Sequence, residues 1–336
     1  MKTLEFAKKI LEIPSPSGYT KNVINFLTKV VEEKGLDYHL TNKGNLIIEM
    51  KGENDYTIGL SAHVDTLGAM VRSVDSKGNL KFSVVGGPIL PTYDGEYCYV
   101  ITRDNKVFSG TFLSDSPAVH VYKDSKTLPR NEENMHVRLD EKVKSKDDVT
   151  KLGIGPGDFI VLDPKTTITD SKFIKSRFLD DKISVAILFS LIDHILENKV
   201  KLKYNLKFII STYEEVGHGA TSIPHVDELI AVDMGCIGED LSCTEYDVSI
   251  CAKDGFSPYD FDLTNKLIEL AKENKLNYAV DIYPYYSSDV SAALRGGNDI
   301  KGALIGPGVS ASHGMERTHL DAVTNTLELL KAYINK

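Results

Sequence analysis

Residues 180–196 read DDKISVAILFSLIDHIL, and from 182 to 196 apolar side chains occupy nearly every face of the predicted helix. A helix that is apolar all round is buried on all sides. We therefore predict that this helix packs against a sheet. Apolar, strand-like segments occur on both sides of it in the sequence, at 45–50, 56–62, 206–213 and 229–232.

Helical patterns alternate with these strands. Residues 3–13 and 20–34 predict two surface helices, the second with Thr20 as its cap, and 321–334 predicts a C-terminal helix. The range 258–275 predicts another helix, with Ser257 as cap and Pro258 as first residue. Such alternation is typical of an α/β fold. The expected fold class is a mixed, largely parallel sheet sandwiched by helices.

Residues 69–165 do not follow this pattern. Short β-like segments at 80–85, 96–101, 107–113 and 159–162 are separated by Gly, Pro and Asp-rich turns, and a charged segment at 145–152 is the helical exception. This range predicts a small β-barrel-like domain inserted into the α/β domain. The α/β domain is then discontinuous and comprises residues 1–68 and 166–336.

Composition excludes some function classes. Acidic residues outnumber basic ones by 48 to 39, for a net charge of −9 over 336 residues. A surface of that sign repels phosphate backbones and anionic lipids, which argues against nucleic-acid and membrane partners. The N-terminal segment is charged, unlike a signal peptide, and the four cysteines lack a C-x-x-C pattern. We expect a cytoplasmic protein with reduced thiols.

Histidine and acidic side chains stand at the ends of the predicted strands. Taken singly, each has a structural explanation, such as a helix cap at Asp180. The carboxyl ends of parallel strands meet at one edge of a sheet, so these residues are expected to converge and together favour a functional site. The set consists of His63, Asp65, Asp180, Asp181, Glu214, Glu215, Asp233 and His313.

The adjacent acids Glu214 and Glu215 follow an apolar strand, so at least one carboxylate is expected to face the interior or the crevice. A buried carboxylate is costly unless it is protonated, paired or bound to a metal. Histidines mixed with carboxylates favour Zn²⁺, Co²⁺ or Mn²⁺ over Ca²⁺ or Mg²⁺. The set fits a dinuclear hydrolytic centre, which needs a bridging carboxylate, terminal ligands and a separate carboxylate base.

Four motifs follow one another along the chain: His63-Val-Asp65-Thr-Leu-Gly, Leu179-Asp-Asp-Lys182, Tyr213-Glu-Glu-Val-Gly217-His-Gly-Ala220 and Ala231-Val-Asp233. In this order, and with the β-rich insertion between the first and second, they resemble the M42 family of metallo-aminopeptidases. The resemblance implies the co-catalytic metallopeptidase fold and an aminopeptidase that removes the N-terminal residue from short peptides. It also implies two divalent ions per subunit (Zn²⁺ or Co²⁺, with Mn²⁺ as an alternative) and a homo-oligomer, often a dodecamer.

The resemblance further implies a role for each site residue. His63, Asp180 and Asp233 would hold one metal, while Asp180, Glu215 and His313 would hold the other, with Asp180 bridging. Glu214 would be the base that activates the metal-bridging water. Asp65 would hydrogen-bond the far nitrogen of His63, and Asp181 would orient the bridging carboxylate.

The sequence departs from the family pattern twice. His218 alone stands where many members have Leu-Arg, and Ser310-Ala-Ser312 precedes His313 where many have Arg-Tyr. His319 is therefore a rival for the last ligand position, and the preferred N-terminal residue is left open. His120 and Asp289 match family positions only loosely.

Other functions are alternatives to an aminopeptidase. A metal-dependent deacylase or carboxypeptidase of M20 type is the main one, although its inserted domain usually comes later in the chain. A glucanase is disfavoured because the chain has no Trp for sugar stacking. A non-catalytic metal-binding protein would not need Glu214 as a base.

Overall fold

The computed structural model describes residues 3–335. The chain divides into two compact units. One comprises the chain up to Thr66 and from Lys165 onward, and the other comprises Leu67–Pro164.

A mixed β-sheet forms the centre of the first unit, with the order β1-β2-β12-β3-β13-β17-β15-β16. Strands β12, β3, β13 and β17 are mutually parallel, whereas β2 and β15 pair antiparallel with their neighbours β12 and β17. The strands are β1 (Tyr38–Leu40), β2 (Leu46–Met50), β3 (Asn54–His63), β12 (Tyr204–Ser211), β13 (Glu228–Val232), β14 (Gly235–Cys236, paired with β17), β15 (Val248–Lys253), β16 (Tyr278–Ile282) and β17 (Lys301–Val309).

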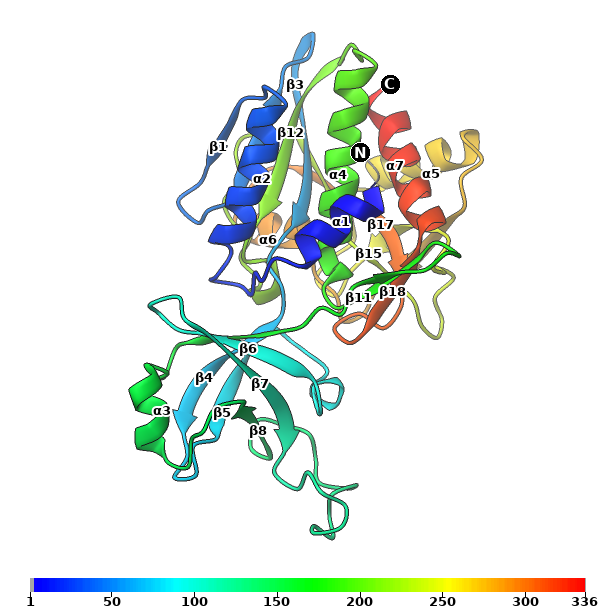
Figure 1. The fold of residues 1–336 in the computed structure, drawn as a ribbon. Helices are drawn as coiled ribbons and strands as arrows, with labels where there is room; N and C mark the ends of the chain where they lie inside the picture. Colours follow the sequence, from blue (N-terminus) through cyan, green and yellow to red (C-terminus); the bar gives the residue numbers. More distant parts are fainter. Residues whose placement is uncertain (1–2, 336) are drawn as a thin grey trace. The chain divides into compact units, whose positions relative to one another are not determined.

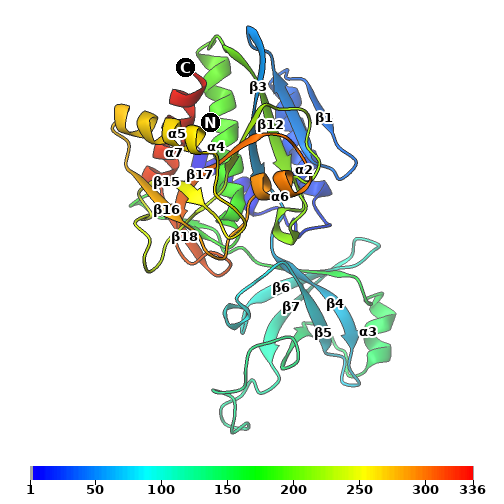
Figure 2. The same ribbon diagram turned by 180° about the vertical axis from the view of Figure 1, so that it is seen from behind.

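Helices cover both faces of this sheet. They are α1 (Thr3–Leu11), α2 (Lys21–Glu33), α4 (Leu179–Glu197), α5 (Phe261–Glu273), α6 (Asp289–Arg295) and α7 (Leu320–Ile334). Helices α1, α2, α4 and α7 lie over one face (Figure 1), and α6 lies over the other (Figure 2). Side chains alternate along β12, so that Phe208 and Ile210 join the core under α4 while Ile209 joins the core under α6.

Helix α4 is buried along almost its whole length, as predicted from its apolar faces. Its first residues, Asp180 and Asp181, have non-helical backbone angles, so the regular helix begins at Lys182. The Lys182 ammonium group is buried and donates to the carbonyl oxygens of Ile10 (2.9 Å) and Ile13 (2.7 Å). These bonds tie the start of α4 to the end of α1.

One predicted helix start is wrong. Helix α5 begins at Phe261, capped by Asp260, which accepts from the Leu263 N–H at 2.8 Å. Pro258 instead pairs with Lys253 in an isolated β-bridge, so the chain is still extended there. Thr20 occupies the N-cap position of α2, as predicted, although its side chain makes no capping hydrogen bond.

Strand β17, which contains Ile305-Gly-Pro-Gly308, was not predicted. Its Gly306 is required by the close approach of the neighbouring chain. A Cβ at Gly306 would lie 1.4 Å from the carbonyl oxygen of Asp233, just beyond β13. The absent side chain lets the chain at Asp233 approach β17 closely and fixes its position.

A smaller antiparallel sheet in the same unit consists of β10 (Thr167–Ile168), β11 (Phe173–Ser176) and β18 (Glu316–His319). Its outer strand β18 follows the loop that carries His313.

The second unit is a closed barrel in the order β4-β5-β8-β7-β6-β9. Its elements are β4 (Gly68–Val74), β5 (Leu80–Val85), η1 (Leu90–Thr92), β6 (Tyr97–Ile101), β7 (Val107–Ser114), β8 (Met135–Leu139), α3 (Lys146–Leu152) and β9 (Phe159–Leu162). Phe82, Val100 and Phe112 are fully buried within the unit. The barrel and the mixed sheet confirm the predicted fold class, although β4 and β8 were not predicted.

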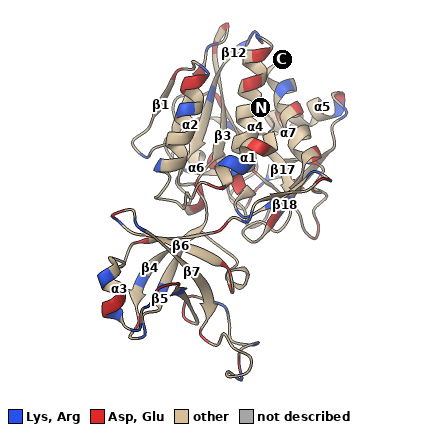
Figure 3. Ribbon diagram, in the orientation of Figure 1, with Lys and Arg blue, Asp and Glu red and all other residues tan. Residues whose placement is uncertain are grey.

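Charge is interspersed on the surface, with Lys beside Asp or Glu along α2 and α3 (Figure 3). Across residues 3–335, none of the helices is long and apolar enough to cross a lipid bilayer.

Candidate metal centre

The predicted site residues lie where the parallel strands end. His63 is the last residue of β3, and Asp233 directly follows β13. Glu214 and Glu215 form a short 3₁₀ turn, η2 (Glu214–Val216), after β12. Asp180 lies at the start of α4. The strand order places β3 between β12 and β13, which brings these residues together at the carboxyl edge of the sheet.

One group of potential ligands consists of His63, Asp180 and Asp233. One ligand atom from each lies within 4.8 Å of the others, and all three residues are buried. The Nε2 atom of His63 is 3.1 Å from Asp180 Oδ1 and 4.0 Å from Asp233 Oδ2.

A second group consists of Asp180, Glu215 and His313, again within 4.8 Å of one another. His313 Nε2 is 3.4 Å from Asp180 Oδ2 and 3.5 Å from Glu215 Oε2. The two oxygens of Asp180 thus face the two histidines, one in each group. His319 lies outside both groups, because its Nδ1 caps α7 and its Nε2 contacts the carbonyl oxygen of Ser171 at 2.9 Å.

Glu214 belongs to neither group, although its Oε2 is 3.8 Å from His63 Nε2. Both glutamates follow the apolar strand, as predicted, but the strand ends earlier than expected: β12 ends at Ser211, and Glu214 and Glu215 lie in the 3₁₀ turn.

Asp65 organises this turn. Its buried carboxylate accepts from the Ser17 hydroxyl (2.5 Å) and from the backbone N–H groups of Glu214 (3.1 Å) and Glu215 (3.3 Å). The predicted hydrogen bond to His63 Nδ1 comes instead from the Asp65 carbonyl oxygen, at 3.0 Å, while the carboxylate is 3.6 Å away. The carboxylate is already occupied by the turn, so Asp65 positions both glutamates.

Glu316 is a site residue that sequence reasoning missed. Its buried carboxylate accepts from the N–H groups of Asp180 and His313, both at 3.0 Å. Glu316 is the first residue of β18, so it links two members of the second group, Asp180 and His313, to that strand. The available signal was its position three residues after His313, which is too short a pattern to be informative alone.

Asp289 also lies beside the turn, at the start of α6, whereas His120 lies in the barrel unit. One Asp289 oxygen accepts from the Ser211 hydroxyl at 2.7 Å. A Cβ at Gly219 would come within 2.9 Å of Glu214 N and 3.0 Å of Asp289 Oδ1, so only glycine fits there. His218 stacks on Tyr213, with ring centroids 4.9 Å apart.

The cluster contains more carboxylates than its two histidines could neutralise if all the acids were ionised. Burial and neighbouring carboxylates raise the pKa of Glu214 and Glu215 well above the ordinary range. Burial followed by the Asp180 charge raises the pKa of Asp233 to about 7. Burial would lower the pKa of His63, but its hydrogen bond to Asp180 and the charge of Glu214 raise it.

Unpartnered oxygens accompany this charge. Among the residues described, Asp181 Oδ1, Glu215 Oε1 and Asp289 Oδ1 are buried without a hydrogen-bond partner. Converging carboxylates that repel one another and lack donors are a donor set suited to positive charge. The residues present therefore fit bound divalent cations.

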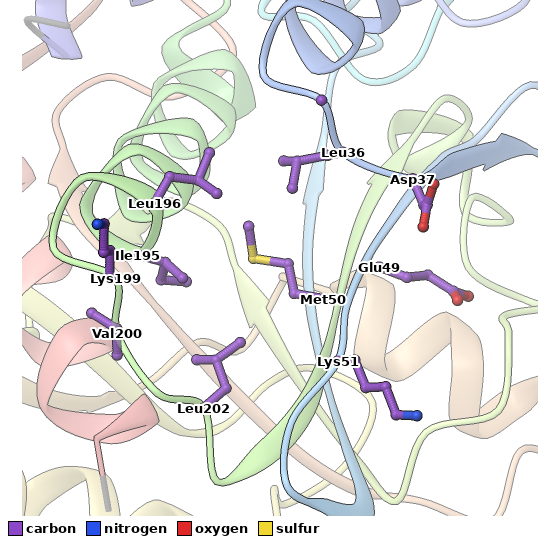
Figure 4. Close-up of a pocket in the computed structure, with 11 residues that line it drawn as sticks. Leu36, Asp37, Glu49, Met50, Lys51, Ile195, Leu196, Lys199, Val200 and Leu202 are labelled. Carbon is purple, nitrogen blue, oxygen red and sulfur yellow. The ribbon is translucent and has the colours of Figure 1, made fainter.

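A groove of about 470 Å³ lies elsewhere, between the end of α4 and strand β2 (Figure 4). Apolar side chains such as Leu36, Met50 and Leu202 line it. Met50 pairs with Leu206 near the start of β12, so the groove lies at the opposite end of the strands from the acidic cluster. It has no part in that site.

Buried carboxylates and histidines at the carboxyl edge of an α/β sheet are typical of metal-dependent hydrolases. The family profile described as M42 glutamyl aminopeptidase matches residues 44–329. YhfE of Bacillus subtilis, a protein whose name assigns it to the aminopeptidases, is 46% identical over 99% of this chain and 97% of its own. The chain belongs to the M42 peptidase family and is a hydrolase that acts on peptides.

Solved structures share the fold. A TET aminopeptidase from the archaeon Thaumarchaeota archaeon SCGC AB-539-E09 has a TM-score of 0.90 at 17% identity, covering 100% of this chain and 97% of its own. The TET1 peptidase of Pyrococcus horikoshii has a TM-score of 0.87 at 23% identity, with 99% of each chain covered.

The acidic cluster predicts how stability depends on pH. In the folded protein the pKa values of Asp289, Asp233 and Glu316 are raised by burial to about 6, 7 and 8, whereas unfolded carboxyls ionise near pH 4. Between these values the folded state binds more protons than the unfolded state, so raising the pH favours unfolding. We expect the melting temperature of metal-free protein to fall between about pH 5 and pH 8.

Thermal unfolding followed by circular dichroism measures this slope. The Glu316→Gln variant lacks the group with the highest of these three pKa values, so its slope should flatten above about pH 7. A melting temperature that is constant or rises over this range would contradict the interpretation.

Proposed function

We propose that this protein is a dinuclear-metal aminopeptidase that removes the N-terminal residue from short peptides. The observation that carries the proposal is that the acids of the site occupy different positions relative to the two ligand groups. Two groups of ligands share Asp180, while Glu214 stands beside them and belongs to neither. A binding site alone would have no use for the separate carboxylate.

His63, Asp180 and Asp233 would hold one ion, and Asp180, Glu215 and His313 the other, with Asp180 between them. The mixture of imidazole and carboxylate favours Zn²⁺ or Co²⁺, with Mn²⁺ as the alternative. When bound, such ions polarise the peptide carbonyl group and lower the pKa of a water molecule.

Glu214 would move the proton. Its carboxylate accepts a proton from the attacking water as the new C–O bond forms at the carbonyl carbon. It then delivers that proton to the amine nitrogen as the C–N bond breaks. A pKa raised by burial suits this role, because the group must both accept and release a proton near neutral pH.

A free α-amino group at the N-terminus of a peptide would approach one of the two ions, which would restrict cleavage to the first residue. An N-acetylated terminus has no such amine and is bulkier.

A panel of aminoacyl-p-nitroanilides tests the proposed activity. Protein stripped of metal should be inactive, and reloading with Zn²⁺, Co²⁺ or Mn²⁺ should restore release of p-nitroaniline. N-acetylated versions of the same compounds are the control and should not react. Equal cleavage of blocked and free substrates would contradict an aminopeptidase and favour a deacylase. If no compound of the panel is cleaved, the proposed aminopeptidase activity is also contradicted.

Substituting the two adjacent glutamates separates their roles. Glu214→Gln should keep its metal content and lose at least about 10²-fold in kcat, as expected when a general base is removed. Glu215→Gln is the matched control and should lose metal as well as activity. Metal analysis of both purified variants measures this, and the reverse pattern would mean that the two roles are exchanged.

We also propose that the chain acts as a homo-oligomer. The support is its likeness to the P. horikoshii TET1 peptidase, whose structure is described as a tetrahedron or a large octahedral shell. Light scattering of the purified protein gives the mass that decides this.

A further inference from the structure

Tyr286 brings a hydroxyl group to the acidic cluster. It lies in the loop between β16 and α6, and its hydroxyl faces the Asp233 carboxylate. That oxygen is shielded from solvent and, within residues 3–335, makes no hydrogen bond of ordinary geometry, although the Asp233 carboxylate is close enough for the hydroxyl to lower the pKa of that carboxyl. A buried donor without a well-placed acceptor is uncommon in folded proteins, so its position calls for an explanation.

The loop holds Tyr286 in place. The carbonyl oxygen of Tyr286 accepts from the Gly255 N–H at 2.9 Å, and its ring packs edge-on against Tyr283 at 5.4 Å. Asp254 fixes the adjoining segment by accepting from the N–H groups of Phe256 and Ser257. A Cβ at Gly255 would lie 3.0 Å from the backbone carbonyl oxygen of Tyr286, so the close approach of the two segments depends on glycine.

The oxygens of the nearby Asp233 carboxylate already have other contacts. Asp233 Oδ1 accepts from the Met234 N–H at 2.6 Å, and its Oδ2 faces His63 in the first group of ligands. A tyrosine phenol keeps its proton at neutral pH, so its O–H group can donate one hydrogen bond. The hydroxyl is therefore a fixed donor at the centre of the site, available to an acceptor on a bound molecule.

We propose that the Tyr286 hydroxyl donates a hydrogen bond to the carbonyl oxygen of the scissile peptide bond as that oxygen becomes negatively charged. The inference rests on the proposed aminopeptidase function. When water adds to the carbonyl carbon, the electron pair of the C=O bond moves onto the oxygen. Tyr286 stabilises this charge and retains its own proton. The pair returns when the C–N bond breaks, and the amine takes the proton that Glu214 carries.

Tyr286→Phe tests the proposal, and Tyr283→Phe is its matched control. Tyr283 lies in the same loop, but its hydroxyl contacts Ser249. Removing one preorganised donor to an oxyanion lowers kcat by about 10²-fold or more. We expect that loss in Tyr286→Phe with an unchanged KM and metal content, and wild-type kinetics in Tyr283→Phe.

A second measurement does not depend on turnover. Calorimetry compares the binding of a phosphinic pseudodipeptide, which imitates the tetrahedral species, with that of the free amino acid product. Tyr286→Phe should weaken the phosphinic ligand by a factor similar to its loss of kcat and leave the affinity for the amino acid unchanged.

Two results would overturn the inference. If kcat and phosphinic affinity stay at wild-type levels, the hydroxyl makes no contact with the reacting oxygen. If metal content falls together with kcat, Tyr286 acts through Asp233 instead. The proposed function itself would be contradicted by a different result: wild-type protein that shows no metal-dependent release from the panel and binds no phosphinic ligand. That result differs from both outcomes above, which concern the variant alone.

Discussion

The organisation of this protein depends on the mutual repulsion of carboxylates that are buried together at one sheet edge. Asp180 lies between the two histidines, and Glu214, Glu215 and Asp233 surround it within the same desolvated space. Burial and like charge favour the protonated forms of Glu214, Glu215 and Asp233, whose pKa values are raised. Asp180 differs, because burial raises its pKa but the hydrogen bonds from His313 and His63 outweigh this and lower it. Such an arrangement is stable in its ionised form only when positive charge offsets it, so the scaffold must hold the acids against their own repulsion.

The scaffold meets this demand through backbone contacts. The N–H groups of Glu214, Glu215, Asp180 and His313 all donate to other buried carboxylates, those of Asp65 and Glu316. Each of these bonds fixes a main-chain position, which leaves the side chain of the residue available for the centre. The strand order and the buried helix α4 then bring the separate segments to one place.

Much of this arrangement could be predicted because its signals are local. The apolar run of α4 and the alternation of strands and helices predicted the α/β unit, and turn-rich sequence predicted the barrel. His63, Asp180, Glu215, Asp233 and His313 each stand at a segment end, where sequence can place them. Glu316, Tyr286 and the true contact of Asp65 could not be predicted, because their roles arise from contacts across long sequence separations. Strand β17 was missed for a related reason, since its glycine serves a neighbouring strand.

Anomalous X-ray diffraction from crystals grown with Zn²⁺, collected at the zinc edge, tests the central claim most directly. The account predicts two peaks per subunit. One is bounded by His63, Asp180 and Asp233, and the other by Asp180, Glu215 and His313, with Glu214 outside both coordination shells. A single peak, a peak at His319, or Glu214 serving as a ligand would contradict the account.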